Sequence, residues 1–207
     1  MARLYDITPA VSPALAVWPG DTPMTREVLL DMRRGDPLTL STLRATVHLG
    51  AHADAPSHYG KEARTIDEVP IETYIGPCRV VRVAVEAGRR VGPAEISWPA
   101  GAERVLIATG TYPDPTRFAR DFSALAPELV ERLHAEGVRL VGIDTPSVDL
   151  SDSKDLPTHQ ACLRCGVAIL EGLVLAEVPE GLYELIALPL KLAGFDASPV
   201  RAVLRER

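Results

Sequence analysis

Three of the five histidines fall within eleven residues, in a segment that also holds a glycine and a proline. The segment begins at His48 and ends at His58, with Gly50 and Pro56 between them. A helix would bring His48 and His52 together at i and i+4, but glycine and proline disfavour a helix here. In extended chain, alternate residues share a face, and positions 48, 52, 54 and 58 are all even. A strand with a bend therefore directs two imidazoles and a carboxylate to one side, with a third imidazole nearby.

Imidazole and carboxylate side chains at this spacing predict a metal site. Together they suit zinc, manganese or iron(II) better than calcium or magnesium alone. The intervening residues are small, and include Ala51, Ala53 and Ala55, so they leave room for an ion. The pattern differs from the helical His-Glu-x-x-His motif, because no glutamate follows His48. The alternative is a chance group of exposed or hydrogen-bonded histidines. The isolated His134 lies within a predicted helix, and we interpret it as a surface or packing residue.

Two distant residues are candidates to complete the site, because one segment rarely supplies every ligand. His159 is the remaining histidine, and Glu171 follows the apolar run Ile169-Leu170. An unpaired carboxylate at the end of a buried strand is unfavourable. Glu171 therefore either binds an ion or, in the structural alternative, forms a salt bridge.

The hydrophobic pattern predicts strands interleaved with fewer helices. We expect strands over residues 4–8, 39–49, 79–85, 104–109, 138–143, 167–171 and 183–190. We expect helices over residues 127–136 and 157–165, with a short helix beginning at 93–96. The order strand, helix, strand over 104–143 resembles a βαβ unit. The fold class is therefore α/β, or α+β with a mixed sheet.

Length and composition limit the class of protein. The chain has 207 residues, and no shift in composition suggests a linker, so residues 1–207 are expected to form a single domain. Its net charge of −6 lacks the basic footprint of a nucleic-acid-binding protein. No apolar stretch approaches the roughly 20 residues that a membrane span needs. Three cysteines and no apolar signal segment favour free thiols and a cytoplasmic location.

Cys162 and Cys165 form a C-x-x-C pair, three residues after His159. A redox pair or a separate zinc site are alternatives, but a structural zinc normally has four protein ligands. Small buried thiols are the interpretation that we favour. A serine hydrolase is not indicated, because the sequence has no Gly-x-Ser-x-Gly elbow.

The pattern His48-x-Gly-x-His52-x-Asp54-x-Pro-x-His58 resembles the signature of the metal-dependent cyclase and amidohydrolase family, which contains the bacterial kynurenine formamidases. Many members have threonine where this chain has Ala51, a departure that removes a hydroxyl but no ligand position. Similar blocks cover nearly the whole chain, namely Tyr-Asp-Ile at 5–7, Val-Trp-Pro-Gly-Asp-Thr at 17–22, Gly-Ile-Asp-Thr-Pro-Ser-Val-Asp at 142–149, Ile-Leu-Glu-Gly-Leu at 169–173, Leu-Ile-Ala-Leu-Pro-Leu-Lys at 185–191 and Ala-Ser-Pro-Val-Arg at 197–201.

The resemblance implies a swivelling β/β/α fold with two metal ions per chain, usually Zn²⁺, with Mn²⁺ as an alternative. By motif position, His48, His52 and Asp54 bind one ion. Asp54 bridges to a second ion, which His159 holds, and Glu171 contacts both. His58 matches the family's proton donor and acceptor, not a ligand. Trp18 matches a substrate-contacting position, with packing in the core or at a dimer interface as its structural alternative.

The resemblance also implies a reaction, the hydrolysis of N-formyl-L-kynurenine to L-kynurenine and formate in tryptophan degradation. Metal ions would activate water, and His58 would protonate the aryl amine that leaves. The expected partners are this small molecule and a second copy of the chain in a homodimer. The alternatives are a related cyclic-amide hydrolase, such as an isatin hydrolase, and a non-catalytic metal-binding protein on the same scaffold.

Overall fold

The computed structural model describes residues 2–96 and 101–207. The strands described are β1 (Leu4–Asp6), β2 (Thr25–Leu30), β3 (Leu40–Arg44), β4 (His52–Asp54), β5 (Ile75–Arg82), β6 (Arg90–Val91), β7 (Arg104–Ala108), β8 (Ala124–Leu125), β9 (Leu140–Ile143), β10 (Ala168–Glu171), β11 (Gly181–Ile186), β12 (Ala197–Pro199) and β13 (Val203–Glu206). The α-helices are α1 (Pro56–Tyr59), α2 (Pro127–Ala135) and α3 (Pro157–Cys165), and short 3₁₀ helices cover Met32–Arg34, Ile66–Glu68 and Ile71–Tyr74. Within these ranges, no helix combines the length and apolar character required to cross a membrane.

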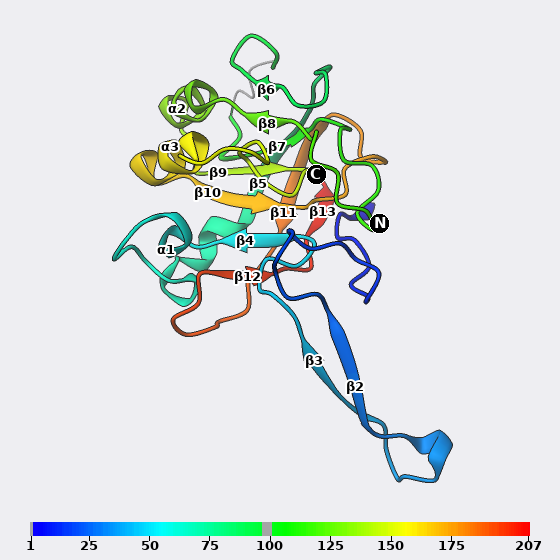
Figure 1. The fold of residues 1–207 in the computed structure, drawn as a ribbon. Coiled ribbons are helices and arrows are strands. Elements are labelled where there is room, and N and C mark those ends of the chain that lie inside the picture. The colour runs from blue at the N-terminus through cyan, green and yellow to red at the C-terminus, as the bar shows by residue number, and fades with distance from the viewer. Residues whose placement is uncertain (1, 97–100) are drawn as a thin grey trace.

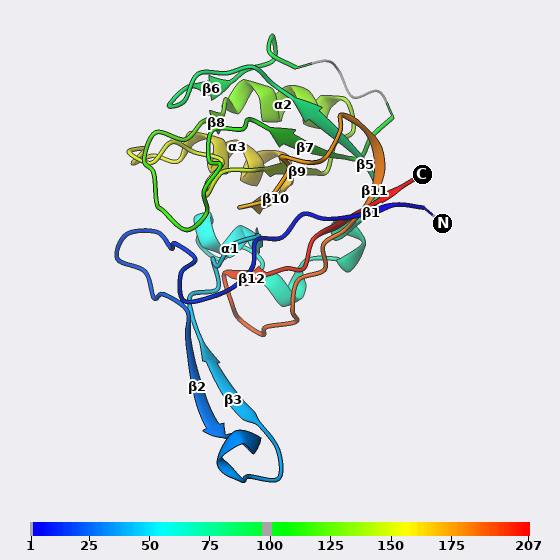
Figure 2. The same cartoon turned by 90° about the vertical axis from the view of Figure 1, so that its right-hand side faces the viewer.

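A mixed sheet of nine strands forms the centre of the molecule, in the order β1-β13-β11-β5-β7-β9-β10-β4-β12. The four strands β5, β7, β9 and β10 run parallel, and antiparallel strands extend the sheet on both sides. β1 pairs with β13, so the two ends of the chain lie together (Figures 1 and 2). This is the mixed α/β class that the sequence predicts.

Helices α2 and α3 connect the parallel strands and cover one face of the sheet. The predicted βαβ unit is confirmed, because β7 and β9 are parallel neighbours joined through α2. On β7, Val105 and Ile107 are buried beside Leu129 and Leu133 of α2. The alternate residue Leu106 belongs to the core on the other face. The sheet is therefore buried on both sides, as parallel sheets generally are.

The β2–β3 hairpin projects from the body as a separate two-stranded ribbon (Figures 1 and 2). Every residue of β3 is exposed, including Leu40 and Leu43. The pairing places Arg26 opposite Leu43 and Leu30 opposite Leu40, with an irregularity between Val28 and Leu30. A lone two-stranded ribbon is only marginally stable in water. The exposed leucines therefore identify a surface that its own chain does not cover.

The structure confirms most of the predicted elements and corrects two. Helix 157–165 is matched at both ends, and helix 127–136 ends one residue early. The strand predicted over 39–49 ends at Arg44, because its pairing with β2 ends there, opposite Thr25, and the chain bends at residues 47–48. Residues 93–96 form a turn and bend instead of a helix, ending where the described residues stop.

Candidate metal centre

Strand β4 carries the centre of the site. His52 and Asp54 alternate with the buried Ala53, so both side chains leave the same face of the strand. β4 pairs with β10 so that His52 lies opposite Glu171. Residues directly opposite in a sheet share a face and lie close together. The register of the sheet therefore brings together two side chains that are 119 positions apart in the sequence, counted from 52 to 171.

A close approach between two loops fixes this arrangement. Gly172 follows Glu171 at a positive φ of 65°, and a Cβ there would overlap the backbone carbonyl of Gly50. That carbonyl accepts a hydrogen bond from Nδ1 of His52 at 2.8 Å. Glycine at 172 therefore allows the turn after β10 to pack against the group that orients His52.

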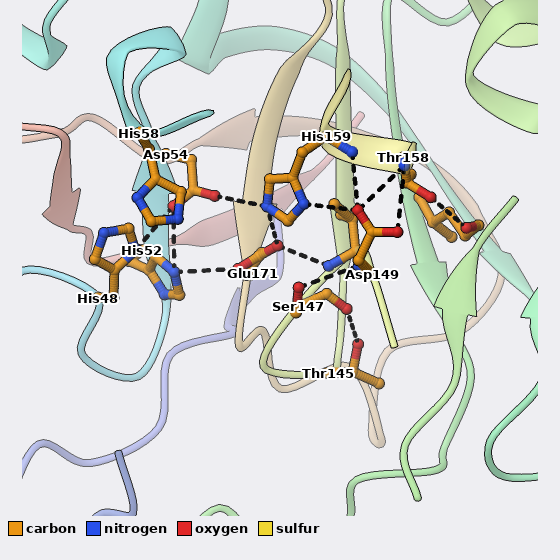
Figure 3. A network of polar contacts seen from close by, with 12 residues as sticks. His48, His52, Asp54, His58, Thr145, Ser147, Asp149, Thr158, His159 and Glu171 are labelled. Atoms are coloured by element: carbon orange, nitrogen blue, oxygen red, sulfur yellow. Dashed lines mark hydrogen bonds and ion pairs between the residues drawn. The ribbon is translucent and has the colours of Figure 1, made fainter. Parts of the chain in front are cut away.

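Four buried side chains form what we call the inner group: His52, Asp54, His159 and Glu171. Nε2 of His52 lies 3.3 Å from Oε2 of Glu171 and 3.5 Å from Oδ1 of Asp54. Nε2 of His159 lies 3.4 Å from Oδ2 of Asp54 and 3.5 Å from Oε1 of Glu171. Figure 3 shows the two imidazoles directed toward carboxylates between them.

The inner group fits a metal ion better than it fits a salt bridge. Nε2 of His52 and both carboxylate oxygens of Asp54 are buried and have no hydrogen-bond partner of normal geometry. Unpaired buried polar atoms are costly and rare. His52, Asp54 and Glu171 each offer a ligand atom, all within 4.8 Å of one another. Imidazole nitrogen with carboxylate oxygen is a donor set for zinc and related ions.

The outer ring nitrogen of His159 is held by Asp149, a residue that the sequence reasoning did not select. Nδ1 of His159 lies 2.9 Å from Oδ2 of Asp149. The same carboxylate accepts the backbone N–H groups of Thr158 and His159 at the start of α3, and pairs with Arg90 at 2.8 Å. Outer partners of this kind set the tautomer and orientation of metal-binding histidines. The signal available in sequence was the place of Asp149 at the end of the 142–149 block, shortly before the predicted helix that carries His159.

A second set, which we call the outer group, consists of His48, His58 and Asp196. Nδ1 of His48 lies 3.1 Å from Oδ1 of Asp54, which links the two groups. Nε2 of His48 lies 3.0 Å from Oδ2 of Asp196, and Nδ1 of His58 lies 3.5 Å from the same oxygen. The rings of His48 and His58 are 4.2 Å apart between centroids. His58 comes from the single turn of α1, not from the strand, and is exposed.

The two groups also differ from isolated side chains in their proton affinity. Burial disfavours the charged form of His159, but Asp149 and Asp54 outweigh it and raise the pKa of His159 to about 10. Burial likewise opposes the charge on His48, while Asp54 and Asp196 raise the pKa of His48 to about 9. The pKa of Asp54 is held well below its usual value despite burial, because imidazoles surround it. Without a metal ion, protons on the imidazoles balance the carboxylates.

The site opens into a cleft of about 1210 Å³. Its lining includes five side chains of the two groups and an aromatic wall: His48, His52, His58, His159, Glu171, Trp18, Tyr112 and Phe118. Trp18 is 38% exposed and contacts Phe118 edge to face at 5.1 Å between centroids. Its ring thus remains available to a ligand, in contrast to a core tryptophan. A flat molecule can lie against this wall with its polar end at the inner group.

The predicted metal-site residues lie together, and all of them except Asp54 line this cleft, as does Trp18. Residue spacing did not select Asp149 or Asp196 as members, although Asp149 ends the 142–149 block that resembles the cyclase family. Cys162 is buried in the core beside α2, and Cys165 is half-buried, both as free thiols. Burial raises the pKa of the Cys162 thiol, which matches the interpretation as an inert packing residue. His134 is exposed on α2, as expected.

Comparison with known proteins gives consistent results. A family model described as "Cyclase: Putative cyclase" matches residues 5–150. The kynurenine formamidase of Maricaulis maris (strain MCS10) is 47% identical over 208 residues, which cover 100% of this chain and 99% of that relative. The solved structure of a potential metal-dependent hydrolase with cyclase activity has a TM-score of 0.86 at 29% identity, covering 100% of this chain and 99% of that one. Isatin hydrolase A from Labrenzia aggregata has a TM-score of 0.81 at 23% identity, covering 99% and 93%, a likeness of fold alone.

Proposed function

This chain belongs to the cyclase family, and we propose that it is a metal-dependent hydrolase that converts N-formyl-L-kynurenine to L-kynurenine and formate. The observation that supports this choice of substrate is the 47% identity to a kynurenine formamidase over the full chain. The buried imidazoles and carboxylates beside an aromatic cleft support the hydrolytic chemistry.

Five residues would hold the metal ions in this proposal. His48, His52 and Asp54 would bind the first ion. Asp54, His159 and Glu171 would bind the second, with Glu171 in contact with both. The unpaired atoms of His52 and Asp54 are the observation in favour of this assignment. Zn²⁺ is the proposed ion and Mn²⁺ the alternative, since both accept this donor set.

When bound, the ions supply Lewis acidity, which activates water and polarises the formyl carbonyl at neutral pH. The protein's own residues then have two tasks. Asp149 and the carbonyl of Gly50 hold His159 and His52 so that their Nε2 atoms face the inner group. His58, which lines the cleft without belonging to the inner group, would carry a proton.

The reaction requires a proton transfer to the leaving amine, and this is the role that we propose for His58. Water adds a hydroxyl to the formyl carbon, the carbon–nitrogen bond breaks, and the aryl nitrogen must gain a proton to leave as an amine. Imidazole can accept and return a proton near neutral pH, and such general acid catalysis is typically worth about 10²–10⁴-fold. We assign the transfer to His58, because it is the exposed imidazole at the mouth of the site.

Trp18 is the proposed contact for the aryl ring of the substrate. Stacking or edge contact with an aromatic ring contributes about 0.5–1.5 kcal/mol beyond area burial. Trp18→Ala should therefore raise KM about two- to tenfold with little change in kcat. Equal KM values for the variant and the wild type would assign Trp18 to packing against Phe118 instead.

One assay tests the proposed function. Metal-free protein, and protein loaded with Zn²⁺ or Mn²⁺, is given N-formyl-L-kynurenine, isatin and formanilide in parallel. We expect metal-dependent turnover that is fastest on N-formyl-L-kynurenine. Preference for isatin would assign the cyclic-amide alternative, and turnover of none of the three would leave a metal-binding protein without this activity.

We also propose that the enzyme is a cytoplasmic homodimer. Three free thiols fit a reducing compartment. The exposed leucines of the β2–β3 hairpin, with Leu43 at 62% exposure, provide an apolar surface that a second copy could cover. Sedimentation should give a dimer for the wild type and a monomer for a Leu40→Glu, Leu43→Glu double variant. A wild-type monomer would contradict the proposal.

A further inference from the structure

We propose that Asp196 is a positioning residue for the proton carrier of this site. One oxygen of its carboxylate is shared by two imidazoles, and it would hold His58 with Nδ1 turned away from the cleft and Nε2 turned toward it. This inference rests on the proposed function for its catalytic consequence, and on geometry alone for the orientation of the ring.

The pairing of the edge strand β12 with β4 positions Asp196 beside the site. β12 pairs with β4 so that Ala197 lies opposite Asp54. Asp196 directly precedes this pair, and its backbone carbonyl accepts the N–H of Ala55 at 2.8 Å. The pairing therefore continues by one residue and brings Asp196 beside the turn of chain that leads into α1 and His58. Figure 1 shows β12 as the edge strand next to β4.

The contacts of the carboxylate are specific to one oxygen. Oδ2 of Asp196 lies 3.0 Å from Nε2 of His48 and 3.5 Å from Nδ1 of His58. Among the residues that the structure describes, Asp196 is the carboxylate within ion-pair distance of the His58 ring. A base whose far nitrogen is held by a carboxylate presents its other nitrogen in a fixed tautomer. Asp196 would orient His58 as Asp149 orients His159, through a longer contact of 3.5 Å against 2.9 Å.

The side chain of Asp196 is not needed to anchor its own loop. Backbone bonds already hold the loop, from Ala55 to the Asp196 carbonyl and from Ile66 to the Phe195 carbonyl. Gly194 in addition donates its N–H to Asp67 at 3.0 Å. The Asp196 side chain is 48% exposed, and exposed ion pairs add little to stability. An asparagine at 196 should therefore leave the fold intact.

Asp67 supplies a matched control for the loop. Its carboxylate accepts hydrogen bonds from Thr65 and from the backbone N–H of Gly194 in the same loop, and forms no ion pair with a histidine of the described residues. Asp67→Asn removes a carboxylate and disturbs the loop without touching the site. Any effect of Asp196→Asn that acts only through the loop should appear in Asp67→Asn as well.

The experiment compares two leaving groups in the zinc-loaded enzyme. The leaving group of N-formyl-L-kynurenine is an aryl amine, which needs a proton to depart. The leaving group of 4-nitrophenyl formate is a stable phenolate, which does not. Asp196→Asn should lower kcat on the amide about 10- to 10²-fold, part of the 10²–10⁴ that general acid catalysis provides. With zinc at saturating concentration, hydrolysis of the ester and KM for the amide should stay within about threefold of wild type, as should all values for Asp67→Asn.

Nitrogen-15 spectra of the imidazoles provide a readout that does not depend on activity. In the zinc-loaded wild type, neutral His58 should carry its proton on Nδ1, and Asp196→Asn should shift it toward Nε2. The same tautomer in both proteins would overturn the proposal, as would equal loss on amide and ester at saturating zinc, or an equal effect of Asp67→Asn. A wild type inactive on the amide would refute the proposed function, and the spectra would still decide the role of Asp196.

Discussion

The inner and outer groups of the site contain the same side-chain types in different surroundings. The inner group, His52, Asp54, His159 and Glu171, is buried, with no member more than 3% exposed. In the outer group, His58 and Asp196 reach solvent, and one carboxylate oxygen serves two imidazoles. The groups meet where Nδ1 of His48 lies 3.1 Å from Asp54, and the ring of His48 also contacts that of His52 at 5.1 Å between centroids.

This contrast indicates a division of labour. Both oxygens of the buried Asp54 carboxylate lack a hydrogen-bond partner, which is unfavourable unless an ion is bound, and this supports our proposal that the inner group binds metal. A proton carrier must exchange protons with solvent or substrate, so it belongs where the outer group lies. His48 stands between the two roles, with one ring nitrogen directed at each group.

The largest expected effect comes from breaking the inner group. Glu171→Gln should lower kcat/KM by at least about 10³-fold, because loss of a ligand exceeds the 10- to 100-fold cost of losing an outer partner. The variant should fold, since the amide oxygen can still accept the hydrogen bond from the backbone N–H of Val148. Steady-state kinetics with excess zinc, alongside circular dichroism, measures both. Activity near wild type would remove Glu171 from the ligand set.

The next effect comes from the outer group. His58→Gln should lower kcat about 10²–10⁴-fold on N-formyl-L-kynurenine, because the leaving amine loses its proton donor. Its affinity for zinc should match that of the wild type. Turnover within a few-fold of wild type would show that another group carries the proton.

A smaller effect should follow from the outer partner of an inner ligand. Asp149→Asn keeps the hydrogen-bonding shape but removes the charge that faces His159 and Arg90. Zinc affinity should fall about 10- to 100-fold, as is typical for such partners. Competition with a chromogenic chelator measures this directly. Unchanged affinity would mean that the carboxylate mainly caps helix α3.

The smallest effect concerns the pH dependence of the metal-free protein. The pKa of His159 is raised to about 10 and that of His48 to about 9, so their stabilisation is complete below about pH 6.5 and is lost as pH rises through those values. Asp149, with a pKa lowered to about 2, acts in the opposite direction and loses its contribution as pH falls. The thermal midpoint of the metal-free protein should therefore decrease from pH 7 to pH 10. A midpoint that is flat over this range would contradict the assigned contacts.

The sequence predicted the part of the site that depends on local spacing. Clustering and chemistry identified His48, His52 and His58, and the burial of Glu171 was inferred from the apolar run before it. Asp196 could not be found this way, since its contact with His58 depends on the pairing of edge strand β12 with β4. Asp149 contacts His159 only because a helix begins between them.

The fold was predictable where the hydrophobic pattern agrees with the residues that start and stop an element. Helix α3, for example, begins at Pro157 and ends before Gly166. The strand predicted over 39–49 failed because β-branched residues continue beyond Arg44 while the backbone bends toward the site. The β2–β3 hairpin was not foreseen as a ribbon. Its leucines resemble core residues in sequence, and only the structure shows them exposed.

Metal counting in matched variants tests the division of labour most directly. Wild type, Glu171→Gln and His58→Gln are each loaded with zinc, passed into metal-free buffer and analysed by mass spectrometry of the metal. The account predicts about two ions per chain in the wild type and in His58→Gln, and fewer in Glu171→Gln. Full occupancy of Glu171→Gln, or equal loss of zinc from His58→Gln, would contradict it.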